Sequence, residues 1–266
     1  MPQDLLRFGF GKNWQRFIQQ YFSDERVELS QKHLLDFLQM SDLEGKYFLD
    51  VGCGSGLHSL AALRAGAARV MSFDVDEEAV NTTSKLKQYA GNPAHWLVRQ
   101  GSILDEAFLQ TIEPADLVYA WGVLHHSGNM WQAFKNTSRL LKEGGLLFVA
   151  LYTDAPYFDL PMAFWLEVKQ RYNRVGWLTK KKMVAWYIWE FYLHKQWRAL
   201  PDLFKQAREY KARGMELYTD VIDWLGGWPM EVAPVEEVQR FGVEQLGLTL
   251  VNIKTGQANA EYLFGR

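Results

Sequence analysis

Between residues 46 and 151, short apolar runs alternate with segments whose hydrophobic positions follow helical spacing. Five of the apolar runs are predicted to be strands: Tyr47–Val51, Arg69–Phe73, Trp96–Arg99, Asp116–Trp121 and Leu146–Leu151. The last run contains almost no polar residue, which is typical of a strand covered on both faces. This alternation predicts a parallel sheet with crossover helices.

Helix-ending and helix-starting residues separate these strands. Ser55–Ala65 is predicted to be a helix that ends at Gly66, and Asp76 is placed to cap a helix that runs to Ala90. A further helix is expected from Met130 to Lys142, where Gly144 and Gly145 would stop it.

Beyond Tyr152 the pattern becomes mostly helical, and alternation returns only at two strands, 248–254 and 259–264, which a tight turn joins. The prediction is therefore an α/β fold with a Rossmann-like, open, mostly parallel seven-stranded sheet. A helical insert precedes its last two strands. Four segments follow from this organisation: a helical segment at 1–45, the core at 46–151, an aromatic-rich insert at 152–243 and a closing hairpin at 244–266.

Composition limits the possible partners. The chain has 266 residues, is 48% hydrophobic and 23% charged, and carries a formal net charge of −2, all ordinary for a globular protein. It shows no basic surplus, so we expect no nucleic-acid partner. The composition gives no information on the oligomeric state.

A single cysteine, Cys53, and an N-terminus without a basic and apolar leader pattern predict a cytoplasmic protein. The aromatic-rich stretch 180–197 begins with three lysines and is too short to span a membrane. Two interpretations stay open for it: a helix between insert and core, or a peripheral contact with a membrane surface.

The clearest chemical signal is LDVGCGSG, residues 49–56, which joins the first strand to a helix. Its three glycines allow a sharp turn and a close approach of a ligand to the backbone. The following helix start favours an anionic group. Asp74 ends the second strand about 20 residues later, where an acid can accept hydrogen bonds from ribose hydroxyls.

With this loop and this acid, the core resembles the class I S-adenosylmethionine-dependent methyltransferases. The resemblance implies that S-adenosylmethionine is the cofactor and that Asp74 holds its ribose. It also implies further contacts with the loop backbone, the adenine and the methionine arm. The residues expected to make these contacts are Asp50, Gly52, Cys53, Gly54 and Gly56 in the loop, Val75, Ser102 and Ile103 at the adenine, and Ala120 and Trp121 at the methionine arm. Members of the family often carry Asp at the position of Ser102, which weakens that contact.

The segment VLHH, residues 123–126, and the RLLKEGG turn that follows resemble small-molecule and quinone-pathway O-methyltransferases. The N/D-P-P-Y/F sequence, with which many nucleic-acid amino methyltransferases grip a base, is not present. If the acceptor is a hydroxyl, an imidazole at this strand end could take its proton, which makes His126, and then His125, candidate bases. Either histidine could instead brace the loop.

The acceptor is expected to meet the insert. Residues 223–234 combine glycines, two tryptophans and a lone acid, Glu231, which is a third catalytic candidate. Aromatic side chains beside one carboxylate suit a sugar, a phenol or an amine as the acceptor. The sequence FGFGKNW, residues 8–14, could close over the cofactor or dock the N-terminus on the core. We assign no residue to a metal.

The sequence thus predicts an enzyme that moves a methyl group from S-adenosylmethionine to a small-molecule or lipid-linked acceptor, at oxygen. Two alternatives stay open. One is a protein that binds S-adenosylmethionine without transferring its methyl group. The other is an NAD-dependent oxidoreductase, against which the glycine spacing and the missing second nucleotide-binding half argue.

Overall fold

A computed structural model of the chain describes residues 7–196, 201, 205, 216–256 and 258–266. Its sheet has the strand order β3-β2-β1-β4-β5-β7-β6, in which β1 to β5 are parallel and β7 runs antiparallel to both β5 and β6. The strands are β1 (Tyr47–Val51), β2 (Arg69–Asp74), β3 (Trp96–Gln100), β4 (Ala115–Trp121), β5 (Leu141–Tyr152), β6 (Thr249–Thr255) and β7 (Asn259–Gly265). The expected Rossmann-like sheet is confirmed.

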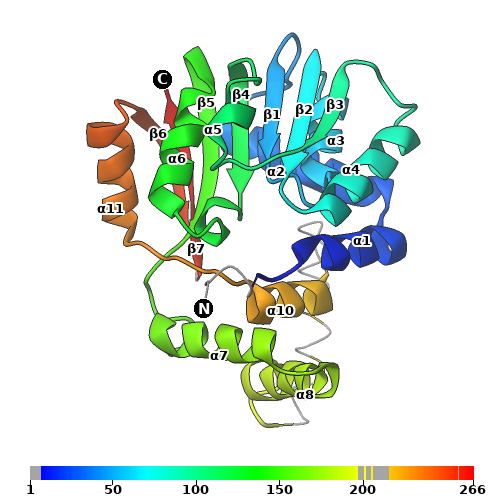
Figure 1. Ribbon diagram of the computed structural model, residues 1–266, viewed down its shortest axis with the longest axis vertical. Coiled ribbons are helices and arrows are strands. Elements are labelled where there is room, and N and C mark those ends of the chain that lie inside the picture. Colours follow the sequence, from blue (N-terminus) through cyan, green and yellow to red (C-terminus); the bar gives the residue numbers. More distant parts are fainter. Residues whose placement is uncertain (1–6, 197–200, 202–204, 206–215, 257) are drawn as a thin grey trace.

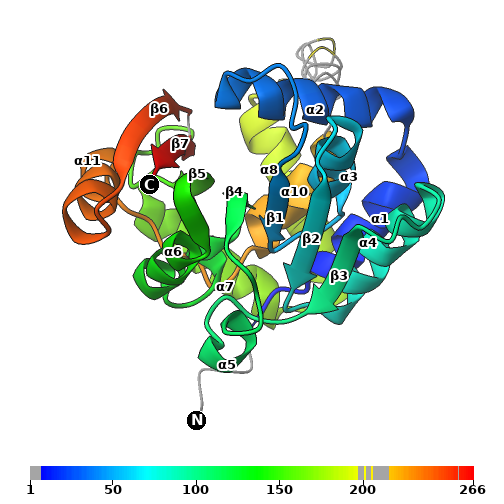
Figure 2. The same ribbon diagram turned by 90° about the horizontal axis from the view of Figure 1, so that it is seen from above.

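Helices cover both faces of this sheet (Figure 2). One face carries α1 (Phe10–Tyr21), α2 (Asp24–Leu38), α3 (Leu57–Arg64) and α4 (Glu77–Tyr89). The other carries α5 (Glu106–Leu109), α6 (Met130–Arg139) and α11 (Val235–Arg240), which continues into a π-helical turn, Phe241–Gln245. Each face buries its own apolar cluster, with Phe48 and Phe148 on the first and Val118 and Val149 on the second. Burial on both faces explains the continuous apolar strands.

The boundary between α6 and β5 differs from the prediction. The helix ends at Arg139, and Gly144 and Gly145 lie inside β5 instead of stopping a helix. The reason is tertiary pairing: the Leu140 carbonyl accepts from the Ala115 N–H at 2.8 Å, and the Gly145 carbonyl accepts from the Arg266 N–H at 3.0 Å. The sheet therefore takes up the chain earlier than local sequence indicates.

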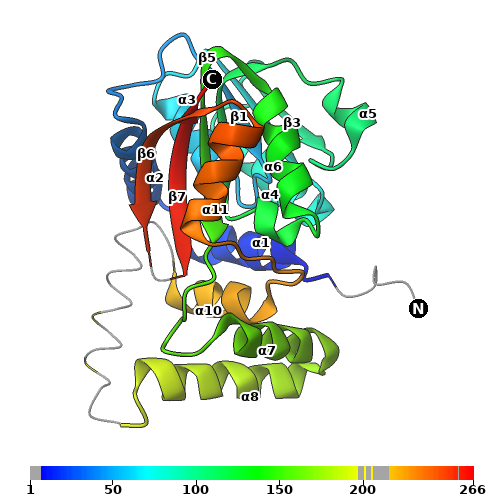
Figure 3. The same ribbon diagram turned by 90° about the vertical axis from the view of Figure 1, so that its left-hand side faces the viewer.

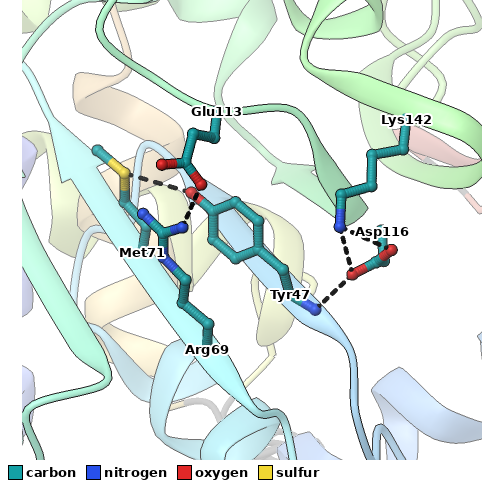
Figure 4. Close-up of polar contacts among 6 residues, drawn as sticks. All are labelled: Tyr47, Arg69, Met71, Glu113, Asp116 and Lys142. Carbon is teal, nitrogen blue, oxygen red and sulfur yellow. Dashed lines mark hydrogen bonds and ion pairs between the residues drawn. The ribbon is translucent and has the colours of Figure 1, made fainter.

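Polar contacts fasten the amino edge of the central strands (Figure 4). The Asp116 carboxylate, at the start of β4, accepts from the Tyr47 N–H at 2.7 Å and from the Lys142 ammonium at 3.0 Å. Arg69, at the start of β2, pairs with Glu113 and lies 4.5 Å above the Tyr47 ring. These contacts hold β1, β2 and β4 together at the edge opposite the glycine loop.

The helical insert lies beyond the carboxyl edge of the sheet. Figures 1 and 3 show its helices stacked outward in the order α10 (Leu217–Gly226), α7 (Met162–Arg174) and α8 (Trp177–Tyr187), followed by a π-helical turn, Ile188–Tyr192. They share a third apolar cluster that includes Trp165, Tyr187 and Trp224. The Ala233 N–H donates to the Tyr152 carbonyl at 3.2 Å, so the insert leaves and rejoins the core at one point.

The interpretation of α8 as a helix between insert and core is not what the structure shows. This helix is the outermost element, with Val184 and Tyr187 buried in the insert and Trp177 and Leu178 exposed. No helix among the described residues combines the length and the apolar character needed to span a bilayer.

Candidate functional site

The glycine loop between β1 and α3 has the backbone conformation that its sequence predicts. Gly52, Gly54 and Gly56 have φ angles of +70°, +52° and +76°, which side chains rarely allow. A Cβ atom on Gly52 would lie 2.4 Å from the Val123 side chain, and one on Gly56 would lie 2.8 Å from that of Thr83. The loop is therefore packed too closely for any residue but glycine at these points.

Asp74, at the carboxyl end of β2, faces this loop. Its two carboxylate oxygens accept from the Gly54 N–H at 3.0 Å and the Asp76 N–H at 2.9 Å. Burial raises the pKa of Asp74, and these backbone donors oppose the rise. The neighbouring Asp76 accepts from the Glu78 N–H at 2.9 Å and so caps α4 as predicted. Val75 is a third backbone donor to this carboxylate, which can accept about four hydrogen bonds and so keeps room for a further donor.

The segment expected at the adenine lies next to this acid. The Gly101 N–H donates to the Asp74 carbonyl at 2.9 Å, Val75 is 45% exposed and Ile103 is buried. The Ser102 hydroxyl accepts from the Leu104 N–H at 3.1 Å and so supports the turn of its own loop. An exposed and a buried apolar side chain thus flank the carboxyl end of β2.

A buried amide that the sequence analysis missed holds this turn from the other side. Asn136 on α6 donates to the Ile103 carbonyl at 2.8 Å and accepts from Gln132 at 2.7 Å. Its signal in the sequence was an amide among the inward-facing positions of an amphipathic helix.

Asp50 and Cys53 lie underneath the loop. The Asp50 carboxylate accepts from the Ser59 hydroxyl on α3, which in turn contacts the Ser72 hydroxyl at 2.7 Å. Burial raises the pKa of Asp50 to about 7, although the Ser59 hydrogen bond acts in the opposite direction. Burial also raises the pKa of the Cys53 thiol, which keeps it protonated. Asp50 is thus tied to α3 and β2, and the Cys53 sulfur, which accepts from the Thr83 hydroxyl at 3.3 Å, is tied to α4.

Helix α1, which contains most of the FGFGKNW sequence, fastens the core to the insert. The Gly11 N–H donates to the Asp76 carboxylate at 2.8 Å, on the core side. On the insert side, Asn13 donates to the Asp223 carboxylate at 2.8 Å and to the Thr219 carbonyl at 3.0 Å. The Trp14 indole lies 3.2 Å from the position of a Cβ on Gly54. This segment therefore connects the core to the insert, and its Trp14 lies against the glycine loop, so both interpretations of the sequence stay open.

The two histidines form a 3₁₀ turn, Leu124–His126, after β4. The Nδ1 atom of His126 lies 2.7 Å from the Pro229 carbonyl, which must accept, so Nδ1 carries the proton and Nε2 keeps its lone pair. Burial lowers the pKa of His126 to about 3. The ring faces Gly227, where a Cβ atom would lie 2.8 Å from its Cε1.

His125 stacks on Tyr152 with ring centroids 4.0 Å apart. Its two ring nitrogens are buried, and neither has a hydrogen-bond partner among the described residues. Burial lowers the pKa of His125 as well, so both imidazoles are neutral at neutral pH. The turn therefore presents uncharged rings to the insert.

Glu231 is tied to the same turn. Its N–H donates to the His125 carbonyl at 2.9 Å, and its carboxylate accepts from the N–H of Met130, the first residue of α6, at 2.9 Å. Burial raises the pKa of Glu231, and the Met130 hydrogen bond opposes this rise. The acid thus occupies the positive end of a helix, where a carboxylate is stabilised.

At the end of β4, Ala120 is fully buried, and the Trp121 indole donates to Glu261 at 2.9 Å. The same Glu261 oxygen lies 3.2 Å from His33 on α2. Sequence reasoning missed Glu261 because it lies on β7, whose antiparallel pairing places it opposite Ala150, the partner of Trp121.

A buried lysine in the insert was also missed. The Lys169 ammonium donates to the Trp224 carbonyl and lies 4.0 Å above the Trp224 ring and 5.7 Å from the Tyr152 ring. Burial lowers its pKa to about 7, whereas the charge of Asp223 favours protonation. Its sequence signal was its spacing from Trp165 and Tyr172, which places it on a buried helix face. Within the described residues, no three His, Cys, Asp or Glu side chains are grouped to hold a metal.

Residues 49–147 match a family described as "Methyltransferase domain". A ribosomal protein L11 methyltransferase of Pectobacterium carotovorum is 37% identical over 83 residues, which are 31% of this chain and 25% of the relative. A tRNA U34 carboxymethyltransferase of Colwellia psychrerythraea is 32% identical over 117 residues, 43% of this chain and 35% of the relative.

A magnesium protoporphyrin IX methyltransferase of Synechocystis, solved with bound S-adenosylhomocysteine, matches in fold. Its TM-score is 0.53 at 14% identity, over 96% of this chain and 93% of the other. The chain spans only about a quarter to a third of the length of the two curated relatives named above. Together these matches confirm the resemblance drawn from the glycine loop and the class of cofactor that it implies.

Proposed function

We propose that this chain, whose core belongs to the class I S-adenosylmethionine-dependent methyltransferases, transfers a methyl group from that cofactor to a small-molecule or lipid-linked acceptor, at a hydroxyl oxygen. One observation carries the proposal: the Asp74 carboxylate lies 3.0 Å from the backbone of a loop whose three glycines have left-handed φ angles. The family match ends at residue 147, before the insert, so the acceptor class does not follow from it.

The residues present fit this cofactor. Gly52 and Gly56 have left-handed φ angles and pack against the side chains of Val123 and Thr83, which fixes the sharp turn of the loop beside Asp74 and suits a cofactor bound at this turn. Asp74 would accept from the ribose hydroxyls through its remaining lone pairs. Val75 and Ile103 would flank the adenine beside Ser102, and the methionine arm would lie toward Ala120 and Trp121. Asp50, Cys53 and Gly54 would hold the loop in shape.

When bound, S-adenosylmethionine supplies a methyl group that is already activated by its sulfonium. The chain's own work is then to place the acceptor in line with that methyl group and to exclude water. Tyr152 and Trp224, whose ring centroids lie 5.4 Å apart, form an aromatic wall between the histidine turn and the insert. This wall favours a flat or apolar acceptor.

A hydroxyl acceptor must lose a proton, and His126 is the residue we assign to take it. The Pro229 carbonyl fixes the His126 proton on Nδ1, which leaves Nε2 as the proton acceptor. The negative charge that develops on the acceptor oxygen would favour the protonated ring and offset its low pKa. His125 is the second candidate, and Glu231 the third because its carboxylate is already used at the start of α6.

Calorimetry tests the cofactor assignment. S-adenosylmethionine and S-adenosylhomocysteine should both bind, whereas NAD should not. Asp74→Ala should weaken S-adenosylhomocysteine binding by about 1.5–3 kcal/mol, the usual contribution of hydrogen bonds to a charged group. Asp105→Ala is the matched control, because Asp105 also follows a strand and caps a helix but lies in an exposed turn. Equal affinities for the two variants would remove Asp74 from the ribose role.

The turnover of histidine variants tests the assignment of His126 as the base. With an acceptor in hand, His126→Ala should lower turnover about 10²–10⁴-fold, the usual contribution of general base catalysis, and leave cofactor affinity unchanged. Mass spectrometry of the product must locate the methyl group on oxygen. Full activity of the single and double histidine variants would leave Glu231 as the remaining candidate. Tight cofactor binding with no methylated product from any acceptor class would favour a binding protein without transfer.

A further inference from the structure

Helix α8 exposes a face that combines apolar and basic side chains. Trp177 is 64% exposed and Leu178 is 59% exposed, the two highest values among the exposed large hydrophobic side chains described. Lys181 and Lys182 follow one turn later, and Ala185 continues the exposed stripe. The opposite face, with Val184 and Tyr187, is buried in the insert. The helix is therefore held by one face and offers the other to the surroundings.

Basic residues gather at this face. Arg171 and Arg174 end α7 immediately before it, and Lys180 lies beside the other two lysines. The sequence has no Asp or Glu from residue 168 to residue 189. Within the described residues, none of these five basic side chains forms an ion pair. A chain with net charge −2 thus concentrates unpaired positive charge at one end.

The N-terminus of α8 has no acidic residue in its first turn and no side-chain cap, and the three lysines follow in its second turn. The ammonium of Lys181 lies 4.7 Å from the Trp177 ring, and that of Lys180 lies 5.1 Å from the Tyr172 ring. Basic side chains next to apolar residues left in water indicate an external partner that is both anionic and apolar.

We propose that the α8 face, formed by Trp177, Leu178, Lys181 and Lys182 with Lys180, Arg171 and Arg174 beside it, docks on an anionic lipid surface. Lysines around exposed Trp and Leu match the composition of helices that lie in a membrane interface. Leu178 decides between lipid and nucleic acid, because an aliphatic side chain enters a bilayer interface but has no counterpart in base stacking.

The position of α8 suits this role. It is the outermost layer of the insert, beyond the carboxyl edge of the sheet (Figures 1 and 3). Docking there would turn the insert toward the lipid. Docking by this face is inferred from the geometry of α8 and does not depend on methyl transfer. It would, however, bring a lipid-linked acceptor to the same end of the molecule.

Vesicle sedimentation with the full chain tests the proposal. The protein should sediment with vesicles of phosphatidylcholine and phosphatidylglycerol, and not with phosphatidylcholine alone. About 1 M salt, where the Debye length is about 3 Å, should release it. Combined Lys180→Gln, Lys181→Gln and Lys182→Gln should weaken binding about 10²-fold, since each basic residue near an anionic surface contributes about fivefold. Combined Trp177→Ser and Leu178→Ser should weaken it at least about 10-fold.

Matched controls distinguish an effect of this face from an effect of the net charge of the protein. Lys85→Gln, Lys87→Gln and Lys135→Gln together make the same charge change elsewhere on the surface, and Val251→Ser removes an exposed apolar side chain from β6. Both control variants should bind the mixed vesicles as the wild type does. Equal losses in the controls, or no vesicle binding by the wild type, would overturn the proposal. Salt-sensitive binding to bulk tRNA that the α8 variants lose, with no binding to vesicles, would assign the face to nucleic acid instead.

Discussion

Gly11→Ala should weaken the junction between α1 and the core. The missing Cβ of Gly11 points at α4, where it would lie 2.6 Å from the Ala79 nitrogen and 2.7 Å from the Asp76 Cγ. Ordinary contact begins near 3.5 Å, so the helices must separate by about 0.9 Å. That shift also stretches the 2.8 Å hydrogen bond from the Gly11 N–H to Asp76.

Two effects oppose each other in this variant. Alanine gains up to about 1 kcal/mol of helix propensity over glycine, less near a helix start. Overpacking costs about 1–3 kcal/mol, and a strained hydrogen bond to a carboxylate adds about 1 kcal/mol or more. The free energy of unfolding should therefore fall by about 1–3 kcal/mol. Urea denaturation followed by far-UV circular dichroism measures this fall.

Gly9→Ala is the matched control, because no described atom lies within 4 Å of its added Cβ and its φ is −84°. It should stay within about 0.5 kcal/mol of the wild type. The Gly11 variant should also bind S-adenosylhomocysteine more weakly, since Asp76 donates its N–H to Asp74. A Gly11→Ala protein as stable as Gly9→Ala would refute the close crossing of α1 and α4.

Two further substitutions test buried groups. The pKa of Lys169 is lowered to about 7, so between pH 7 and 9 the unfolded chain binds more protons than the folded one and the lysine's penalty shrinks as pH rises. Wild-type stability measured against Lys169→Met should therefore improve by about 2 kcal/mol over that window in urea titrations, and a constant difference would mean that the ammonium is not buried. Glu231→Gln keeps the contact with Met130 but removes the charge from the start of α6, so it should cost about 0.3–1 kcal/mol of stability and leave turnover intact. A large loss of turnover would move the base from His126 to Glu231.

The parts of this fold that the sequence predicts correctly are local. The glycine loop, the cap at Asp76 and the strand at Leu146–Leu151 each depend on residues within a few positions, and all three are present. The start of β5 depends instead on Arg266, whose N–H donates to Gly145. No property of residues 139–145 contains that information, so the helix was extended too far.

The site shows the same division. Asp74 could be placed because the acid and the loop belong to adjacent parallel strands. Glu261 could not, because its neighbour Trp121 lies far away in sequence and only the antiparallel register of β7 joins them. The spacing of Lys169 from Trp165 and Tyr172 indicates a buried helix face, but the Trp224 ring that its ammonium contacts comes from another helix and could not be predicted. Helix α8 is apolar around most of its circumference, so periodicity does not reveal which side stays exposed.

The hydrogen bond between the Ala233 N–H and the Tyr152 carbonyl has a consequence for the evolution of proteins with this architecture. Because both ends of the insert meet there, the sheet is insensitive to how much chain lies between them. The entropic cost of closing a longer loop grows only with the logarithm of its length. A different set of helices could therefore be exchanged at this junction, giving the same cofactor half a new acceptor, provided that it also supplies the contacts that Asp223, Pro229 and Glu231 make with the core.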